Sequence, residues 1–148
     1  MSKRYKKVLL AVDYHEDNME VIATASELQQ LYDAELHIVH VNEPLSVAYA
    51  ADGVTWGSQV YELDTIIRKE NEKKMEELKA ALSLSDDQCH QVEGRPSTRI
   101  HEICEEGDFD LIVLGTHGQH GLQLLLGSTA NAVLHGSPCD VLSVRLRS

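Results

Sequence analysis

Short apolar runs alternate along the chain with longer segments in which apolar residues recur every three or four positions. Continuous apolar runs of this length are typical of parallel strands that are buried on both faces of a sheet. The third run is the most polar and therefore predicts a strand near the sheet edge. The predicted strands cover residues 8–12, 36–41, 89–92, 111–114 and 141–144.

The segments between the early runs predict two helices and a loop. The first helix should begin with a capping box formed by Asp17 and Glu20. A second, long helix is predicted over residues 60–82, whereas residues 46–58 show no period and predict a loop. We expect the apolar stripe of the long helix to pack on the core; it consists of Val60, Leu63, Ile67, Met75, Leu78 and Leu82.

The second half of the chain predicts two shorter helices. One should be capped by Ser97 or Thr98, carry Cys104 on its buried stripe and stop at Gly107. The other should cover residues 128–135. Because strands and helices alternate, we predict an α/β fold in which a doubly wound parallel sheet has right-handed crossovers and helices on both faces.

The length of the chain indicates how many domains it forms. A chain of 148 residues is normally one domain, so we predict that residues 1–148 form a single domain. Doubly wound sheets bind ligands at the carboxyl ends of their strands, where the strand order reverses. Residues 11–13, 41–42 and 115–118 follow three predicted strands, and they would surround one pocket if the first and fourth strands are neighbours.

A glycine-rich loop follows the fourth predicted strand. Glycine lets a ligand approach the backbone closely, and the loop leads into a helix that begins with Ser128 and Thr129. A helix N-terminus presents unpaired N–H donors, which bind phosphate readily. The loop therefore predicts a nucleotide phosphate site, although Gly127 and Ser128 are equally consistent with a loop end and a helix cap. The glycines of the loop are Gly115, Gly118, Gly121 and Gly127.

Three features together resemble the universal stress protein family. They are a strand ending at Asp13, a second ending in His40-Val41, and Gly115-x-x-Gly118 followed by Gly127-Ser128. The resemblance covers essentially the whole chain. It implies a Rossmann-like, five-stranded parallel sheet in the order 3-2-1-4-5 and a homodimer joined along the last strand, residues 141–144.

The resemblance also implies an adenine-nucleotide site for ATP or AMP. Asp13 matches an acid beside the nucleoside, and Val41 matches a residue whose backbone meets adenine. Ala11 and Val12 match residues that line the wall beside the nucleoside. Leu114 and Gly115 match residues that form the floor under the ribose. The remaining loop and phosphate positions are Thr116, His117, Gly118, Gly127, Ser128 and Thr129. Eight residues separate Gly118 from Gly127, one fewer than in the nucleotide-binding pattern of the family.

The charge balance excludes several partners and describes the predicted phosphate site more closely. The chain carries 13 basic and 24 acidic residues, a formal net charge of -11, which disfavours nucleic acid and anionic membrane surfaces. Residues 111–139 contain no charged side chain other than histidine. Phosphates there would be held by N–H groups, hydroxyls and Mg²⁺ without a lysine.

The location of the protein is predicted from what the sequence lacks. No apolar run is long enough to span a membrane, and the N-terminus leads straight into a strand, so we predict an unexported, cytoplasmic protein. The cysteines are Cys89, Cys104 and Cys139; they form no C-x-x-C pair and are expected to be reduced thiols.

Enzyme and metal signatures are weak. The sequence has no P-loop, no G-x-G-x-x-G after the first strand and no G-x-S-x-G, so we assign no catalytic residue. His117, His120 and His135 have no acidic or cysteine partner at ligand spacing, and we predict no metal site made of side chains.

Three functions remain open. The first is a nucleotide-binding regulator of stress responses that acts through its conformation or through a regulatory protein partner the sequence does not identify. The second is a dimeric interaction module with a vestigial pocket, which the shortened loop favours. The third is a slow ATPase, for which Asp13 and His117 are the candidate bases.

Overall fold

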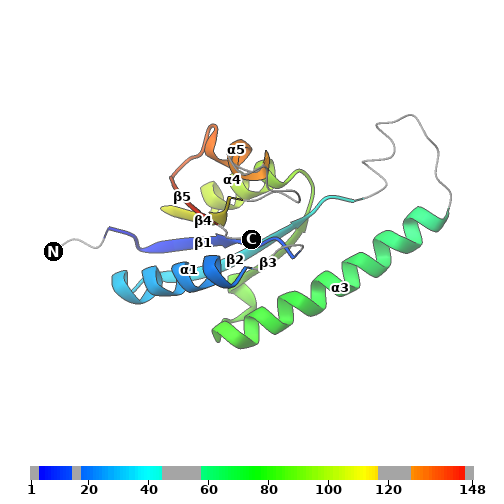
Figure 1. The fold of residues 1–148 in the computed structure, drawn as a ribbon, viewed down its shortest axis with the longest axis horizontal. Coiled ribbons are helices and arrows are strands. Elements are labelled where there is room, and N and C mark those ends of the chain that lie inside the picture. Colours follow the sequence, from blue (N-terminus) through cyan, green and yellow to red (C-terminus); the bar gives the residue numbers. More distant parts are fainter. Residues whose placement is uncertain (1–3, 15–17, 45–57, 117–127, 146–148) are drawn as a thin grey trace.

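The computed structural model describes residues 4–14, 18–44, 58–116 and 128–145 (Figure 1). The described strands form a five-stranded sheet in the order β3-β2-β1-β4-β5, and every neighbouring pair is parallel. This confirms the predicted doubly wound sheet, with the polar third strand at one edge. The strands are β1 (Lys7–Ala11), β2 (Glu35–Asn42), β3 (Cys89–Glu93), β4 (Leu111–Gly115) and β5 (Asp140–Val144).

Helices cover both faces of the sheet, as predicted: α1 and α3 lie on one side in Figure 1, and α4 and α5 on the other. Within the described residues, no helix has both the length and the apolar character needed to cross a bilayer. Apart from Ser58, the predicted loop over residues 46–58 lies outside the described residues. The helices are α1 (Met19–Tyr32), α3 (Ser58–Leu82), α4 (Pro96–Glu106) and α5 (Ser128–Leu134), and a 3₁₀ turn, η1 (Asp86–Gln88), precedes β3.

Side chains that alternate along β1 build two separate core layers. Val8 and Leu10 pack with α1 and α3, whereas Leu9 packs with α4 and α5. All three are fully buried. A strand buried on both faces needs apolar residues at consecutive positions, which explains the continuous run that identified β1 in the sequence.

The start of α1 differs from the prediction. The helix begins at Met19 with Asn18 at its N-cap, so the cap predicted at Asp17 is wrong by one residue. The Asn18 side chain makes no cap hydrogen bond and instead bonds the backbone of Asp13, the residue that follows β1 by two positions.

The start of α4 also differs. Its N-cap is Arg95 and its first residue is Pro96, so the predicted caps Ser97 and Thr98 lie inside the first turn. Proline suits the first helical position because its fixed φ is helical and its missing N–H would have no partner there.

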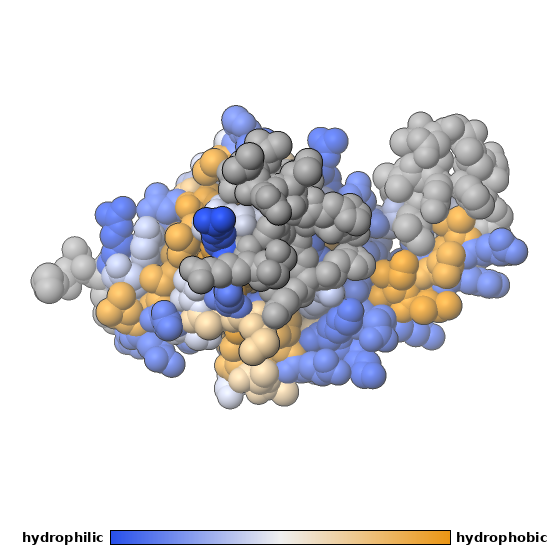
Figure 2. All heavy atoms as spheres, in the orientation of Figure 1, coloured by the Kyte–Doolittle hydropathy of each residue, from blue (hydrophilic) through white to orange (hydrophobic). Residues whose placement is uncertain are grey.

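The buried face of α3 includes Val60 and Met75, as predicted, but it departs from the predicted stripe between these two residues. Met75 is buried against the sheet, and the same face continues back through Asn71 and Asp64, both of them buried. Leu63, which the prediction placed in the stripe, is 50% exposed. In Figure 1 this half of α3 extends beyond the sheet, and Figure 2 shows hydrophobic side chains gathered there. The exposed apolar side chains of this segment are Tyr61, Leu63 and Ile66.

Gly107 ends α4 as predicted, but for a packing reason. It takes φ -93, and the left-handed conformation falls on Asp108 at φ 54. A Cβ atom at Gly107 would lie 2.4 Å from Cε2 of Phe109. Phe109 belongs to the core layer beneath α4. Glycine is therefore required at this position by the close approach of an aromatic ring.

Replacing Gly107 with Ala should lower the free energy of unfolding by about 1–3 kcal/mol, because the added methyl overpacks the Phe109 ring. An alanine that fitted at this φ would instead stabilise the protein by about 0.4–1 kcal/mol through the unfolded chain. Urea denaturation measures the change in the free energy of unfolding, and the sign of that change shows whether the added methyl overpacks Phe109 or fits. In a Phe109→Leu background the cost should shrink or reverse, and a Gly107→Ala variant at least as stable as the parent would contradict the packing.

Candidate functional site

The strand order reverses between β1 and β4. From β1 the chain adds β2 and then β3 on one side, and it adds β4 and then β5 on the other. Ligand crevices of doubly wound sheets lie at the carboxyl ends of the strands at such a point. The sequence predicted that the three segments meet if the first and fourth strands are neighbours, and β1 and β4 are indeed hydrogen-bonded neighbours.

The first predicted segment follows β1. Ala11 is the last residue of the strand, and Val12 is buried with its N–H donating to the carbonyl of Val39 at 2.9 Å. The backbone of Asp13 is held at both of its polar groups by Asn18. Asn18 Nδ2 donates to the Asp13 carbonyl at 2.5 Å, and the Asp13 N–H donates to Asn18 Oδ1 at 3.3 Å. The start of α1 thus fixes Asp13 at the carboxyl end of β1.

Val41 lies near the end of β2, where its backbone passes the end of β1. The ladder between the two strands ends with Ala11 opposite Val39. The carbonyl of Val39 accepts from the N–H of Val12 on the β1 side. The carbonyl of Asn42 accepts from the N–H of Gly94 on the β3 side, at 3.0 Å. Because alternate residues of a strand bond opposite neighbours, the N–H and C=O of Val41 face the β1 side beyond the last pair of the ladder.

The third segment follows β4. Leu114 is buried in the layer beneath α4 and α5, and Gly115 pairs with Val144 of β5. The N–H of Thr116 donates to the carbonyl of Val144 at 3.0 Å. The direction in which the chain leaves β4 is therefore set by the edge strand β5.

The described residues bring together the segments at the ends of β1, β2 and β4. The predicted phosphate positions are covered only in part: Ser128 is the first residue of α5, and Thr129 follows it as an exposed residue. His117, Gly118 and Gly127 lie outside the described residues.

Sequence reasoning missed a polar cluster at this edge, formed by Tyr14, His40 and Gln91 and called here the Tyr14 cluster. The rings of Tyr14 and His40 stack with centroids 3.9 Å apart. The Tyr14 hydroxyl donates to Gln91 Oε1 at 3.3 Å, and Gln91 Nε2 lies 2.8 Å from His40 Nδ1. Because an amide nitrogen only donates, His40 Nδ1 accepts and its proton lies on Nε2.

The Tyr14 cluster joins the end of β1 to β2 and β3. Burial raises the pKa of Tyr14 above its usual range, so its hydroxyl stays protonated and keeps donating. The cluster lies on the α1 and α3 side of the sheet, where Tyr14 packs against the core. The positions of Tyr14 beside Asp13 and of His40 beside Val41 were the available signal, but only the strand register shows that they meet.

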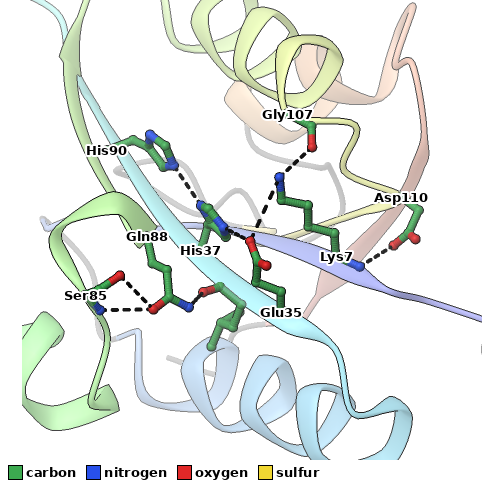
Figure 3. Close-up of polar contacts among 9 residues, drawn as sticks. Lys7, Glu35, His37, Ser85, Gln88, His90, Gly107 and Asp110 are labelled. Atoms are coloured by element: carbon green, nitrogen blue, oxygen red, sulfur yellow. Dashed lines mark hydrogen bonds and ion pairs between the residues drawn. The ribbon is translucent and has the colours of Figure 1, made fainter.

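A second polar network, called here the amino-edge network, lies at the opposite ends of the strands (Figure 3). Lys7 donates through Nζ to the carbonyl of Gly107 at 2.7 Å and lies 3.9 Å from a Glu35 carboxylate oxygen. His37 contacts Glu35 through Nε2, and its Nδ1 lies 3.0 Å from Nε2 of His90. The network ties β1, β2, β3 and the end of α4 together.

The electrostatics of the amino-edge network favour a structural role. Burial lowers the pKa of His90, and the nearby His37 and Lys7 lower it further. The hydrogen bond with His37 lowers the pKa of Glu35. Within the described residues, no group of three or more His, Cys, Asp or Glu side chains is arranged to hold a metal ion.

Comparison with known proteins finds relatives along the whole length of the chain. Residues 4–145 match the universal stress protein family. The chain is 43% identical over 147 residues to universal stress protein A homolog 2 of Coxiella burnetii, with 97% of both chains covered. It is 38% identical over 144 residues to universal stress protein A homolog 1 of the same organism, covering 97% of this chain and 98% of that one.

Solved structures show the same fold. Universal stress protein UspA from Lactobacillus plantarum matches with a TM-score of 0.77 at 21% identity, over 97% of this chain and all of that one. A universal stress protein solved in complex with cAMP matches with a TM-score of 0.60 at 24% identity, over 96% of this chain and 98% of that one.

The lowered pKa of His90 predicts that acid destabilises the protein. The folded state favours the neutral His90 ring, and this preference adds to the free energy of unfolding. The added stability is fully present above the pKa of about 6.5 in the unfolded chain, and it is lost as the pH falls below that value toward the pKa in the folded protein. Urea denaturation at pH 7.5 and pH 5.0 measures the change. A His90→Gln variant, which keeps Lys7, Glu35 and His37, should lose less stability between the two pH values than the parent. Equal losses would contradict the assignment.

Proposed function

Because the chain belongs to the universal stress protein family, we propose that it is a cytoplasmic regulator of stress responses that binds ATP or AMP, with Mg²⁺, at the carboxyl ends of β1, β2 and β4. Binding would act through the conformation of the protein or its capture of a partner. The observation that carries the proposal is that Asp13, Val41 and Gly115 lie at the carboxyl ends of three adjacent strands. These strands stand at the point where the strand order reverses.

The base and the sugar would lie over these strand ends. Val41 offers a backbone N–H and C=O beyond the β1 ladder, which suits the polar edge of adenine. The Asp13 carboxylate would accept hydrogen bonds from the ribose hydroxyls, and Asn18 holds its backbone in place. The apolar surface under them would come from Ala11, Val12 and Leu114.

The phosphates would lie over the segment that joins β4 to α5. Gly115, Thr116, His117, Gly118, Gly127, Ser128 and Thr129 would provide backbone N–H groups, hydroxyls and an imidazole. Because residues 111–139 contain no Lys or Arg, Mg²⁺ would supply the positive charge that the side chains do not. Affinity should therefore depend on the metal.

Binding of ATP should raise the midpoint of thermal unfolding, because a ligand that binds only the folded state stabilises it. Isothermal titration should give a Kd that weakens at least tenfold when Mg²⁺ is omitted. A Ser128→Ala variant should weaken binding about tenfold, as expected when one hydrogen bond to a charged phosphate is lost. Thr65→Ala removes an exposed hydroxyl of α3 that donates to the Tyr61 carbonyl, and this control should bind like the parent.

The same titration distinguishes the alternatives. Absence of heat and of any thermal shift at millimolar ATP, AMP or cAMP would overturn the proposal and favour an interaction module with a vestigial pocket. Phosphate release above the background rate, lost in Asp13→Asn, would establish a slow ATPase. Mass spectrometry of nucleotide released from the denatured, purified protein identifies the natural ligand.

We also propose that two chains pair through β5. It lies at one edge of the sheet beside β4, and Leu142 is partly exposed on it. An edge strand presents unpaired backbone groups that favour pairing with a second strand. Because Val144 of β5 bonds Thr116 at the predicted phosphate segment, a partner on β5 would influence nucleotide binding, and nucleotide would influence pairing to the same extent.

Light scattering after size exclusion should show a dimer at micromolar concentration. Leu142→Lys should shift it toward monomer, because two such lysines on paired edge strands would repel and lose apolar contact. Leu31→Lys is the matched control, since Leu31 is an exposed leucine on α1, and it should leave the dimer intact. A monomeric parent, or a dimer that Leu142→Lys does not weaken, would contradict pairing through β5.

A further inference from the structure

Two cysteines from separate parts of the chain meet on the α4 side of the sheet. Cys104 lies on α4, and Cys139 immediately precedes β5. Their Sγ atoms are 3.0 Å apart although the residues are 35 positions apart in the sequence, and both are free thiols. A disulfide has an S–S bond of about 2.05 Å, so an approach of roughly 1 Å would join them.

The surroundings of the two thiols differ. Cys104 is 1% exposed and packs in the layer beneath α4, whereas Cys139 is partly exposed. Ser137 fixes the backbone of Cys139: its Oγ donates to the Cys139 carbonyl at 2.7 Å and accepts from the Cys139 N–H at 3.3 Å. The accessible sulfur is therefore held directly against the buried one. The third cysteine, Cys89, lies on β3 and packs in the opposite core layer.

We propose that Cys104 and Cys139 form a redox site that a hydroperoxide converts to an intramolecular disulfide. The Cys139 thiolate attacks the peroxide oxygen, the O–O bond breaks, and a sulfenic acid forms while the other oxygen leaves as water or an alcohol. Cys104 then attacks the sulfenic sulfur, the S–O bond breaks, and water leaves. The two thiols lose two electrons and two protons, and the hydroperoxide is reduced.

The disulfide would close a covalent ring from α4 to the start of β5. This ring contains β4, α5 and the segment between them, so it would fasten the edge strand to the helix beneath it. Burial raises the pKa of both thiols, so little thiolate is present at neutral pH and oxidation should be slow. Such reversible pairs act as redox sensors in reducing compartments. The proposal does not depend on nucleotide binding.

The experiment treats the full-length protein with hydrogen peroxide and identifies the product by intact mass and peptide mapping. The expected product has lost two hydrogen atoms and yields one peptide pair that joins Cys104 to Cys139. Dithiothreitol should reverse the change. The oxidised protein should unfold at a temperature roughly 5–15 °C higher than the reduced protein, because the cross-link restricts the unfolded chain.

Three variants test the assignment. Cys89→Ser should form the same disulfide as the parent. Cys104→Ser should stop at a sulfenic acid on Cys139 that dimedone traps, and Cys139→Ser should form no intramolecular disulfide. A cross-link that includes Cys89, a disulfide between two chains, or oxidation of Cys139 in the parent without a link to Cys104 would each overturn the proposal.

Discussion

β1 is hydrogen-bonded to β2 on one side and to β4 on the other, and Val8, Leu9 and Leu10 at its centre are fully buried. This placement organises the rest of the molecule. A central parallel strand requires crossover helices on both faces, which separates the core into two layers. It also makes the strand order reverse beside β1, so the segments at the ends of β1, β2 and β4 meet at one edge. The proposed nucleotide site follows from this pairing.

The two ends of the strands are organised differently. At the amino ends, Lys7, Glu35, His37 and His90 contact one another and the end of α4, and their polar groups are used within the protein. At the carboxyl ends, Asn18 fixes Asp13 while the backbone of Val41 extends beyond the β1 ladder. Polar groups that face past the end of a ladder suit a ligand, which is why we place the nucleotide at the carboxyl edge.

The last strand connects three proposed properties. β5 pairs with β4 and bonds Thr116 where the phosphate segment begins, and it forms one edge of the sheet. Cys139 stands at its start, against Cys104 of α4. Nucleotide, a second copy of the chain and an oxidant would therefore act on the same short strand. Among the described strands β5 pairs with β4 alone, so fewer hydrogen bonds oppose a change in its contacts than oppose a change at β1.

The sequence by itself determined each strand to within one residue at its ends, and most of each helix, because continuous or periodic burial leaves a local pattern of apolar residues. The family resemblance, which rests in part on the motif Gly115-x-x-Gly118, added the strand order. Only the tertiary structure showed that Asp64, and not the predicted Leu63, lies on the buried face of α3. It alone brought together Tyr14, His40 and Gln91, or Cys104 and Cys139. These contacts depend on strand register and on the distance between remote segments, and neither leaves a periodic signal in the chain.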